Sequence, residues 1–133
     1  MSNLEKVRIL RGGLAVAAAL AAGSILSTSG QAQVNEKHSR ELFEKRCGGC
    51  HALDREKEGP RLGGVYGRPA GSIASFQYST ALQKSKITWT SQTLEKWLTD
   101  PEKLVPDNDM AFHVENPTER LEIISYLKEH SGK

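Results

Sequence analysis

The chain has 133 residues, which is room for one domain, and its 18 basic and 16 acidic side chains almost balance. The small excess of positive charge comes from the first 32 residues, because the rest of the chain carries 15 charges of each sign. A surface with so little net charge argues against nucleic acid or an anionic lipid surface as the main partner.

The first 32 residues predict a signal peptide rather than part of the domain. Basic side chains within positions 6–11 precede a 13-residue apolar run over 14–26, which is too short to span a bilayer comfortably. Small residues favour cleavage after Ala32, and an uncleaved anchoring helix is the alternative. We therefore expect residues 33–133 to form one exported domain with no stable insertion in a membrane.

A helix is predicted from Asn35 to Arg46, and it leads directly into the sequence Cys47-Gly48-Gly49-Cys50-His51. Two thiols followed by an imidazole at this spacing are typical of c-type haem attachment. The sulfurs of Cys47 and Cys50 would form thioether bonds to the porphyrin, and His51 would ligate the iron through one ring nitrogen. The residues thus predict one covalently bound haem, which would also add apolar mass to a small domain.

Three other uses of the two cysteines compete with haem attachment: a redox-active CxxC pair, half of a zinc site, and two structural cysteines. The redox pair would need a βαβ context, which this chain lacks. A zinc site would need further ligands, but the chain has no other cysteine and only three other histidines. Haem attachment remains the favoured interpretation.

Four glycines and a proline between Gly59 and Arg68 predict a tight irregular loop. The segment matches neither a P-loop nor a dinucleotide fingerprint, which require a Gly-Lys-Ser/Thr sequence or a βαβ unit. Glycines would let the backbone lie against a flat ligand. We expect the carbonyl of Pro60 to accept a hydrogen bond from the outer nitrogen of His51, which would fix the orientation of the imidazole and raise its basicity.

Two helices are predicted in the second half of the chain, after a stretch over 72–88 that we interpret as loop with one short helical turn. The first helix runs from about Ser91 to Thr99, with Trp97 on its apolar stripe, and Asp100-Pro101 ends it. A turn over 106–110 then carries Met110.

The last helix begins after Asn116, a good N-cap, with Pro117 at the first helical position and Glu119 placed to complete a capping box. Its apolar stripe consists of Leu121, Ile124 and Leu127, widened by Ile123 and Tyr126. No strand is predicted, so the fold class is a small all-α domain.

The order of these motifs resembles the class I cytochromes c of the mitochondrial and bacterial cytochrome c2 type. The resemblance covers Leu42 to Leu127. The sequence motifs that carry the resemblance are, in chain order, Leu42-Phe43 before Cys47, Gly59-Pro60-x-Leu62, Gly67-Arg68, Phe76-x-Tyr78, Ile87-Thr88-Trp89, Leu94-x-x-Trp97-Leu98, Pro106-x-x-x-Met110-x-Phe112 and Ile124-x-Tyr126-Leu127.

This resemblance implies a cytochrome c fold in which the first and last helices cross at the small residue Ser39 and loops wrap one haem. It implies Met110 as the sixth iron ligand, opposite His51. The positions of Arg68, Tyr78 and Trp89 match family residues that bond or screen a buried haem propionate.

Several positions depart from the family pattern. Trp97 stands where the family usually has a tyrosine near the methionine sulfur, and Leu82 replaces a buried asparagine. Acidic residues lie around the Met110 loop, where mitochondrial-type proteins carry mostly lysine, so association with partners should be only weakly steered by charge. These residues are Glu102, Asp109 and Glu115.

The function that the resemblance implies is a soluble, monomeric one-electron carrier and not an enzyme, and the predicted signal peptide would place it in the periplasm. Its partners would be redox proteins: an oxidase, a cytochrome bc1-type complex or a periplasmic dehydrogenase. The alternative is a peroxidase or gas sensor with a labile sixth ligand, suggested by His113 three residues after Met110. A thiol-disulfide enzyme using Cys47 and Cys50 is a weaker alternative.

Overall fold

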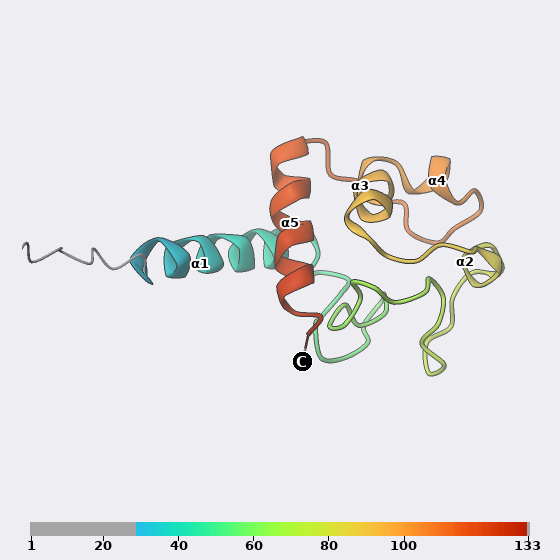
Figure 1. Ribbon diagram of the computed structural model, residues 1–133. Helices are drawn as coiled ribbons and strands as arrows, with labels where there is room; N and C mark the ends of the chain where they lie inside the picture. The colour runs from blue at the N-terminus through green and yellow to red at the C-terminus, as the bar shows by residue number, and fades with distance from the viewer. Residues whose placement is uncertain (1–28, 133) are drawn as a thin grey trace, which may run out of the picture.

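The computed structural model describes residues 29–132, with side chains from Asn35 onward. Five helices are joined by long loops (Figure 1), and the described part contains no strand, only an isolated bridge between Pro69 and Thr88. The all-α prediction is therefore confirmed. The expected signal peptide lies almost wholly outside the described residues and stays a prediction. The helices are α1 (Ser29–Arg46), α2 (Thr80–Lys84), α3 (Ser91–Thr99), α4 (Pro101–Leu104) and α5 (Pro117–Glu129).

Helix α1 begins at Ser29, six residues before the predicted start at Asn35. The added segment contains alanine and glutamine, which favour helix, and nothing after Gly30 interrupts the helix before Arg46. At its other end the chain continues in a tight turn, in which the N–H of Cys47 bonds the carbonyl of Phe43 over 2.7 Å. This turn places the two cysteines and His51 directly at the end of α1.

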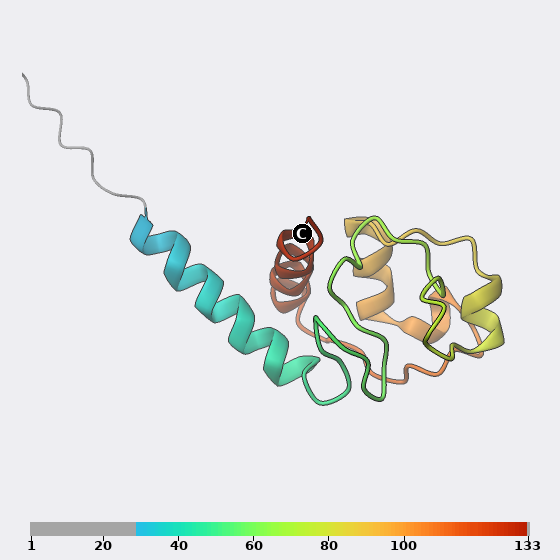
Figure 2. The same cartoon turned by 90° about the horizontal axis from the view of Figure 1, so that it is seen from below.

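Helices α1 and α5 cross, as the resemblance implied, and the first half of α1 extends past α5 away from the loops (Figure 2). Ser39 is buried, and the rings of Phe43 and Tyr126 pack with their centroids 5.2 Å apart. The carboxylate of Glu119 accepts from the guanidinium of Arg46 at 2.6 Å. This cross-helix ion pair takes the place of the predicted capping box, and Asn116 alone caps α5 by accepting from two backbone N–H groups.

One predicted core residue of α5 lies on the outside. Leu121 is 63% exposed, whereas Ile123, Ile124 and Leu127 are buried. At 3.6 residues per turn, Leu121 points to the side of α5 opposite Ile123. The predicted apolar stripe therefore included one residue too many, and the core-facing side of α5 begins at Ile123.

Helix α3 has the predicted bounds, but a second short helix, α4, follows it directly. Asp100 ends α3 and also caps α4, because its carboxylate accepts from the N–H of Lys103 at 3.0 Å. Pro101, read as a helix terminator, occupies the first turn of α4. The short helix turns the chain back so that the segment carrying Met110 runs along α3.

The core is one continuous apolar cluster to which α1, α3, α5 and the loops between them all contribute. Trp89 and Trp97 are buried in it, and Leu82 and Met110 are partly buried against it. Trp89, Trp97 and Met110 therefore face the same interior.

Candidate functional site

The two cysteines differ in their surroundings. Cys47 is buried and Cys50 is exposed, and neither forms a disulfide in the structure. Burial raises the pKa of the Cys47 thiol to about 12, with a smaller opposing effect from Arg46. A thiol with so high a pKa is a poor nucleophile at neutral pH, which argues against Cys47 as the attacking thiol of a thiol-disulfide enzyme.

The ring of His51 is held from behind by the loop that begins at Gly59. Its Nδ1 lies 2.8 Å from the carbonyl oxygen of Pro60, the contact predicted from the sequence. A Cβ at position 59 would overlap the His51 ring, so only glycine fits there. Burial lowers the pKa of His51, which favours the neutral imidazole that a metal requires. With Nδ1 donating to Pro60, the lone pair of Nε2 is left for a metal.

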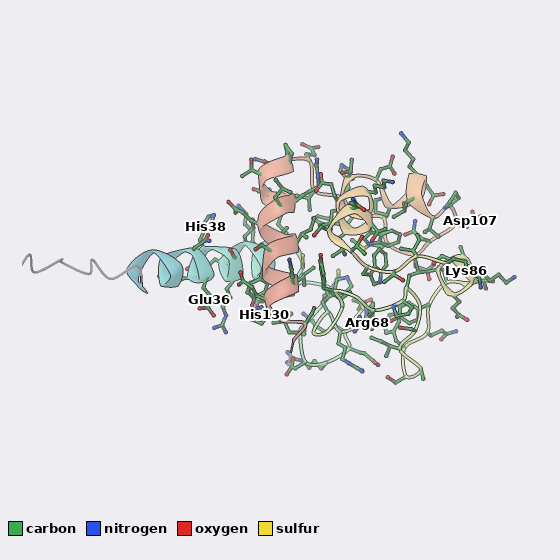
Figure 3. The ribbon with its side chains drawn as sticks, viewed as in Figure 1. Glu36, His38, Arg68, Lys86, Asp107 and His130 are labelled. Carbon is green, nitrogen blue, oxygen red and sulfur yellow. The ribbon has the colours of Figure 1, made fainter. Side chains whose placement is uncertain are left out.

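The Gly59 to Arg68 loop is fixed by hydrogen bonds to the preceding segment and by the side chain of Arg68. The N–H groups of Leu62 and Gly63 bond carbonyls at Ala52 and Leu53, at 2.8 and 2.9 Å. The guanidinium of Arg68 donates to the carbonyls of Arg61 at 3.0 Å and Gly63 at 3.1 Å. Arg68 lies among the loops below α3 (Figure 3), where it stabilises this irregular segment.

Arg68 and Tyr78 lie close enough to influence each other's ionisation. Burial lowers the pKa of the Arg68 guanidinium, and burial raises the pKa of Tyr78, with each side chain opposing the shift of the other. Backbone bonds join Trp89 to the same region, because its N–H donates to the carbonyl of Arg68 at 3.0 Å. The three residues matched to propionate contacts therefore occupy neighbouring segments.

Met110 lies beside the indole of Trp97. The Nε1 of Trp97 donates to the Met110 sulfur at 3.1 Å, and the ring centroids of Trp97 and Trp89 are 5.3 Å apart in an edge-to-face contact. Trp97, which stands where the resemblance placed a tyrosine near the methionine sulfur, thus donates a hydrogen bond to that sulfur. His113, in contrast, is half exposed, with its Nε2 4.0 Å from Glu115.

The turn before Met110 is built by residues that the sequence analysis did not assign to the site. The side-chain oxygen of Asn108 accepts from the N–H of Met110 at 2.7 Å. The carboxylate of Glu102 accepts from the N–H of Asp107 at 3.0 Å and from the amide of Asn108 at 3.2 Å. Asp107 has φ of 62°, a left-handed conformation that its short polar side chain tolerates. The Pro-Asp-Asn sequence was the available signal for this turn.

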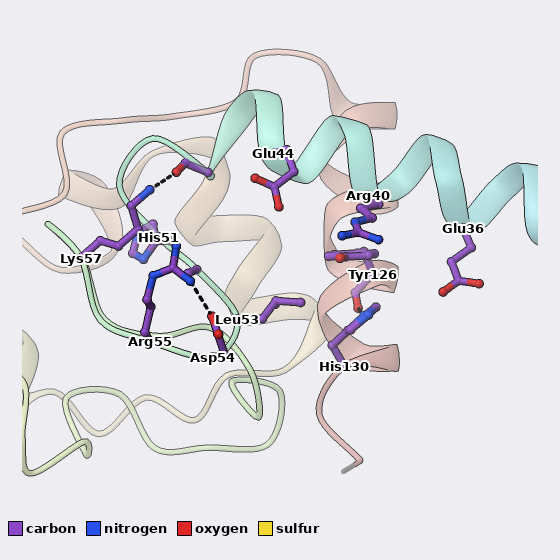
Figure 4. Close-up of a pocket in the computed structure, with 12 residues that line it drawn as sticks. Glu36, Arg40, Glu44, His51, Leu53, Asp54, Arg55, Lys57, Tyr126 and His130 are labelled. Carbon is purple, nitrogen blue, oxygen red and sulfur yellow. Dashed lines mark hydrogen bonds and ion pairs between the residues drawn. The ribbon is translucent and has the colours of Figure 1, made fainter.

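A cavity of about 410 Å³ lies beside the His51 loop, between α1 and the end of α5 (Figure 4). Its lining is mostly charged, with both signs present, as in Arg40 with Glu44 and Arg55 with Asp54. An apolar ring with two covalent anchors does not suit such a lining. We therefore place the candidate site on the side of the apolar core, where Trp97 and Met110 lie and Cys47 is buried.

The residues on that side fit a haem attached through two thioethers. Cys47 and Cys50 would supply the sulfurs, His51 would be an oriented nitrogen donor, and Met110 would offer a thioether sulfur. In the part of the chain that the structure describes, no group of three or more His, Cys, Asp or Glu could hold a metal ion in the manner of zinc.

Comparison with known proteins decides the family. The family model for cytochrome c matches residues 37–131. The chain belongs to the cytochrome c family. Cytochrome c of Chlamydomonas reinhardtii is 36% identical to it over 109 residues, which cover 78% of this chain and 97% of that protein. Cytochrome c2 iso-2 of Magnetospirillum fulvum is 44% identical over 85 residues, which cover 62% and 88%.

A solved structure shows the same fold. Cytochrome cH from Methylobacterium extorquens matches with a TM-score of 0.66 and 36% sequence identity, over 71% of this chain and 97% of that one. This confirms the resemblance to class I c-type cytochromes, which carry electrons and are not enzymes. Within residues 29–132, no helix is long and apolar enough to cross a membrane.

Proposed function

We propose that this cytochrome c holds one haem c through Cys47 and Cys50, with His51 and Met110 as the two iron ligands. The observation that carries the proposal is the hydrogen bond from Trp97 to the Met110 sulfur, because it holds a thioether in the apolar core. When bound, the haem supplies a ferric/ferrous couple. A His/Met pair favours the ferrous form over two harder donors and so raises the reduction potential.

The chain's own residues keep both ligands in one arrangement. Pro60 orients the His51 ring, Gly59 leaves space for it, and Asn108 fixes the backbone of Met110. A site held in this way needs little rearrangement when the charge at its centre changes, which suits electron transfer. Arg68, Tyr78 and Trp89 are proposed to bond or screen a haem propionate, since they place donors in neighbouring segments.

The proposed setting is the periplasm, after removal of residues 1–32, with residues 33–133 as a monomeric domain. The proposed partners are redox proteins: a terminal oxidase, a cytochrome bc1-type complex or a periplasmic dehydrogenase. Exposed acidic residues near Met110, such as Glu102, Asp109 and Glu115, favour partners whose docking surfaces are not strongly acidic.

The test is to express the full chain in a host that attaches c-type haem, and to measure its mass and a redox titration. The expected mass is that of the cleaved chain plus one haem, and the titration should be reversible with one electron. Replacing both Cys47 and Cys50 with Ser should abolish covalent haem. Rapid binding of carbon monoxide to the ferrous protein would instead support a peroxidase or gas sensor with an open sixth position.

A further inference from the structure

One arginine fastens the end of the segment that carries Met110 to helix α5. Arg120, in the first half of α5, donates from Nη1 to the carbonyls of Val114 at 2.7 Å and Glu115 at 2.9 Å. Its side chain is only 11% exposed. The carbonyls belong to the residues four and five positions after Met110, so Arg120 fastens the end of that segment to α5.

Arg120 is itself held by a carboxylate from another helix. Its Nε donates to Oε1 of Glu95, in α3, at 2.7 Å. The second oxygen of Glu95 is buried and has no hydrogen-bond partner among the described residues. Leaving one carboxylate oxygen buried and unpaired is costly, although the Glu95 side chain as a whole is 34% exposed, and the ion pair with Arg120 offsets part of this cost.

Helix α3 carries Trp97, the residue that donates a hydrogen bond to the sulfur of Met110. Glu95 precedes Trp97 by two residues, and the indole of Trp97 donates to the Met110 sulfur. The N–H of Val114 also bonds the carbonyl of Leu98 at 2.8 Å. The pair formed by Glu95 and Arg120 therefore joins the helix that carries the donor to the segment that carries the sulfur.

We infer that Glu95 and Arg120 are positioning residues that keep Met110 on the iron. The inference rests on the proposed His51/Met110 ligation and goes beyond it. When the pair is intact, α3 and residues 110–115 move as one unit, and the Trp97 N–H stays aligned with the sulfur. When the pair is broken, the segment gains freedom to move away from α3, and the sixth position opens more often to outside ligands.

A second ion pair provides a matched control. Arg46 and Glu119 form an ion pair of 2.6 Å, are likewise more buried than exposed, and also tie α5 to another helix. This pair connects α5 to α1, and none of its hydrogen bonds or ion pairs to the described residues reaches the segment 110–115. The substitutions Glu95→Gln and Glu119→Gln are thus alike in chemistry, and they differ in whether the affected pair reaches the Met110 segment.

The experiment measures the rate of cyanide binding to the ferric holoprotein, together with its near-infrared charge-transfer band and thermal midpoint. We expect Glu95→Gln to raise the rate about tenfold, the effect of losing one charge-assisted hydrogen bond, and Glu119→Gln to leave it within about twofold. Arg120→Lys keeps the charge but loses the planar set of donors, so it should raise the rate too. In the double variant with Glu95→Gln and Arg120→Lys, the increase in the logarithm of the cyanide-binding rate should be smaller than the sum of the two single increases.

Equal cyanide rates for Glu95→Gln and Glu119→Gln, with similar thermal midpoints, would show a purely structural pair and overturn this inference alone. Absence of the near-infrared band from the unmodified protein would show that Met110 is not a ligand. That result would overturn the proposed ligation and this inference with it. Should Glu95→Gln fail to fold, the rate for Arg120→Lys decides between the two outcomes in the same way.

Discussion

The indole N–H of Trp97 acts on the sulfur lone pairs of Met110. With Met110 bound to iron as proposed, a donor at this position would draw electron density from the sulfur and leave it a weaker donor to ferric iron. Trp97→Phe removes the N–H but keeps an aromatic ring, so the reduction potential should fall. The expected fall is roughly 20 to 60 mV, from a net hydrogen-bond contribution of about 0.5 to 1.5 kcal/mol and about 59 mV per tenfold change.

The measurement is a redox titration of both proteins with the near-infrared band followed in the same samples. Tyr66→Phe is the control, because it also removes one donor from an aromatic side chain, and the hydroxyl of Tyr66 pairs with Ser91 and not with the sulfur. An unchanged or raised potential in Trp97→Phe, with the band retained, would show that this hydrogen bond does not tune the site.

Tyr78 makes stability depend on pH above neutrality. Burial raises its pKa in the folded chain above the ordinary 10.0, so the unfolded chain gives up this proton first as the pH rises. The contribution of Tyr78 is therefore fully present below pH 10 and is lost as the pH rises from there toward the folded pKa. Tyr78→Phe should flatten the alkaline decline in the free energy of unfolding.

Denaturant unfolding of the ferrous protein at a series of pH values checks this expectation. Tyr66→Phe is a suitable control, because the pKa of Tyr66 is lowered by its hydrogen bond with Ser91. Tyr66→Phe should therefore not flatten the alkaline decline in the free energy of unfolding. An identical slope in Tyr78→Phe and the unmodified protein would contradict the assigned burial of the phenol.

At the scale of elements, the crossing of α1 and α5 depends on a small side chain at Ser39. Ser39→Leu would force the two helices apart and should cost about 1 to 3 kcal/mol of unfolding free energy, as overpacking of a core usually does. Ser39→Ala keeps the volume small and should leave stability nearly unchanged. Thermal or denaturant unfolding of the holoprotein distinguishes them, and a Leu variant as stable as the Ala variant would mean that the crossing is loose.

Local signals explain which elements the sequence could predict. The bounds of α3 and the cap of α5 follow from neighbouring residues, and so does the contact of His51 with Pro60, only nine positions apart. Helix α4 was missed because Asp100-Pro101 was read only as the end of α3. The same Asp-Pro pair is also a cap followed by proline at the first helical position, as at Asn116-Pro117.

Contacts between distant parts of the chain could not be predicted in this way. Arg46 and Glu119 are 73 positions apart, and Glu95 and Arg120 are 25 apart, so no local pattern links them. The local sequence at Glu119 predicted a capping box with Asn116, whereas in the structure the Glu119 carboxylate pairs with Arg46. The pairing of Trp97 with Met110 was expected only through the family resemblance, and the polar turn at Asn108 was not assigned to the site at all.

At the scale of the whole molecule, charge balance decides how the protein meets its partners. With equal numbers of acidic and basic residues in 33–133, long-range attraction to either sign of charge should be weak. We expect the rate of oxidation by anionic ferricyanide to change less than about threefold between low and physiological ionic strength. A cationic cobalt complex serves as the comparison. A steep fall with salt for one reagent alone would reveal a charged patch near the site of electron exit.

The central claim is that Met110 and His51 together ligate one covalent haem. The most direct measurement is the ferric absorption spectrum of the exported holoprotein and of Met110→Ala, in the near-infrared region that reports an iron–sulfur bond. The account predicts a band in the unmodified protein and its loss in Met110→Ala, with the haem still attached. A high-spin spectrum without the band in the unmodified protein, or a band that survives in Met110→Ala, would contradict it.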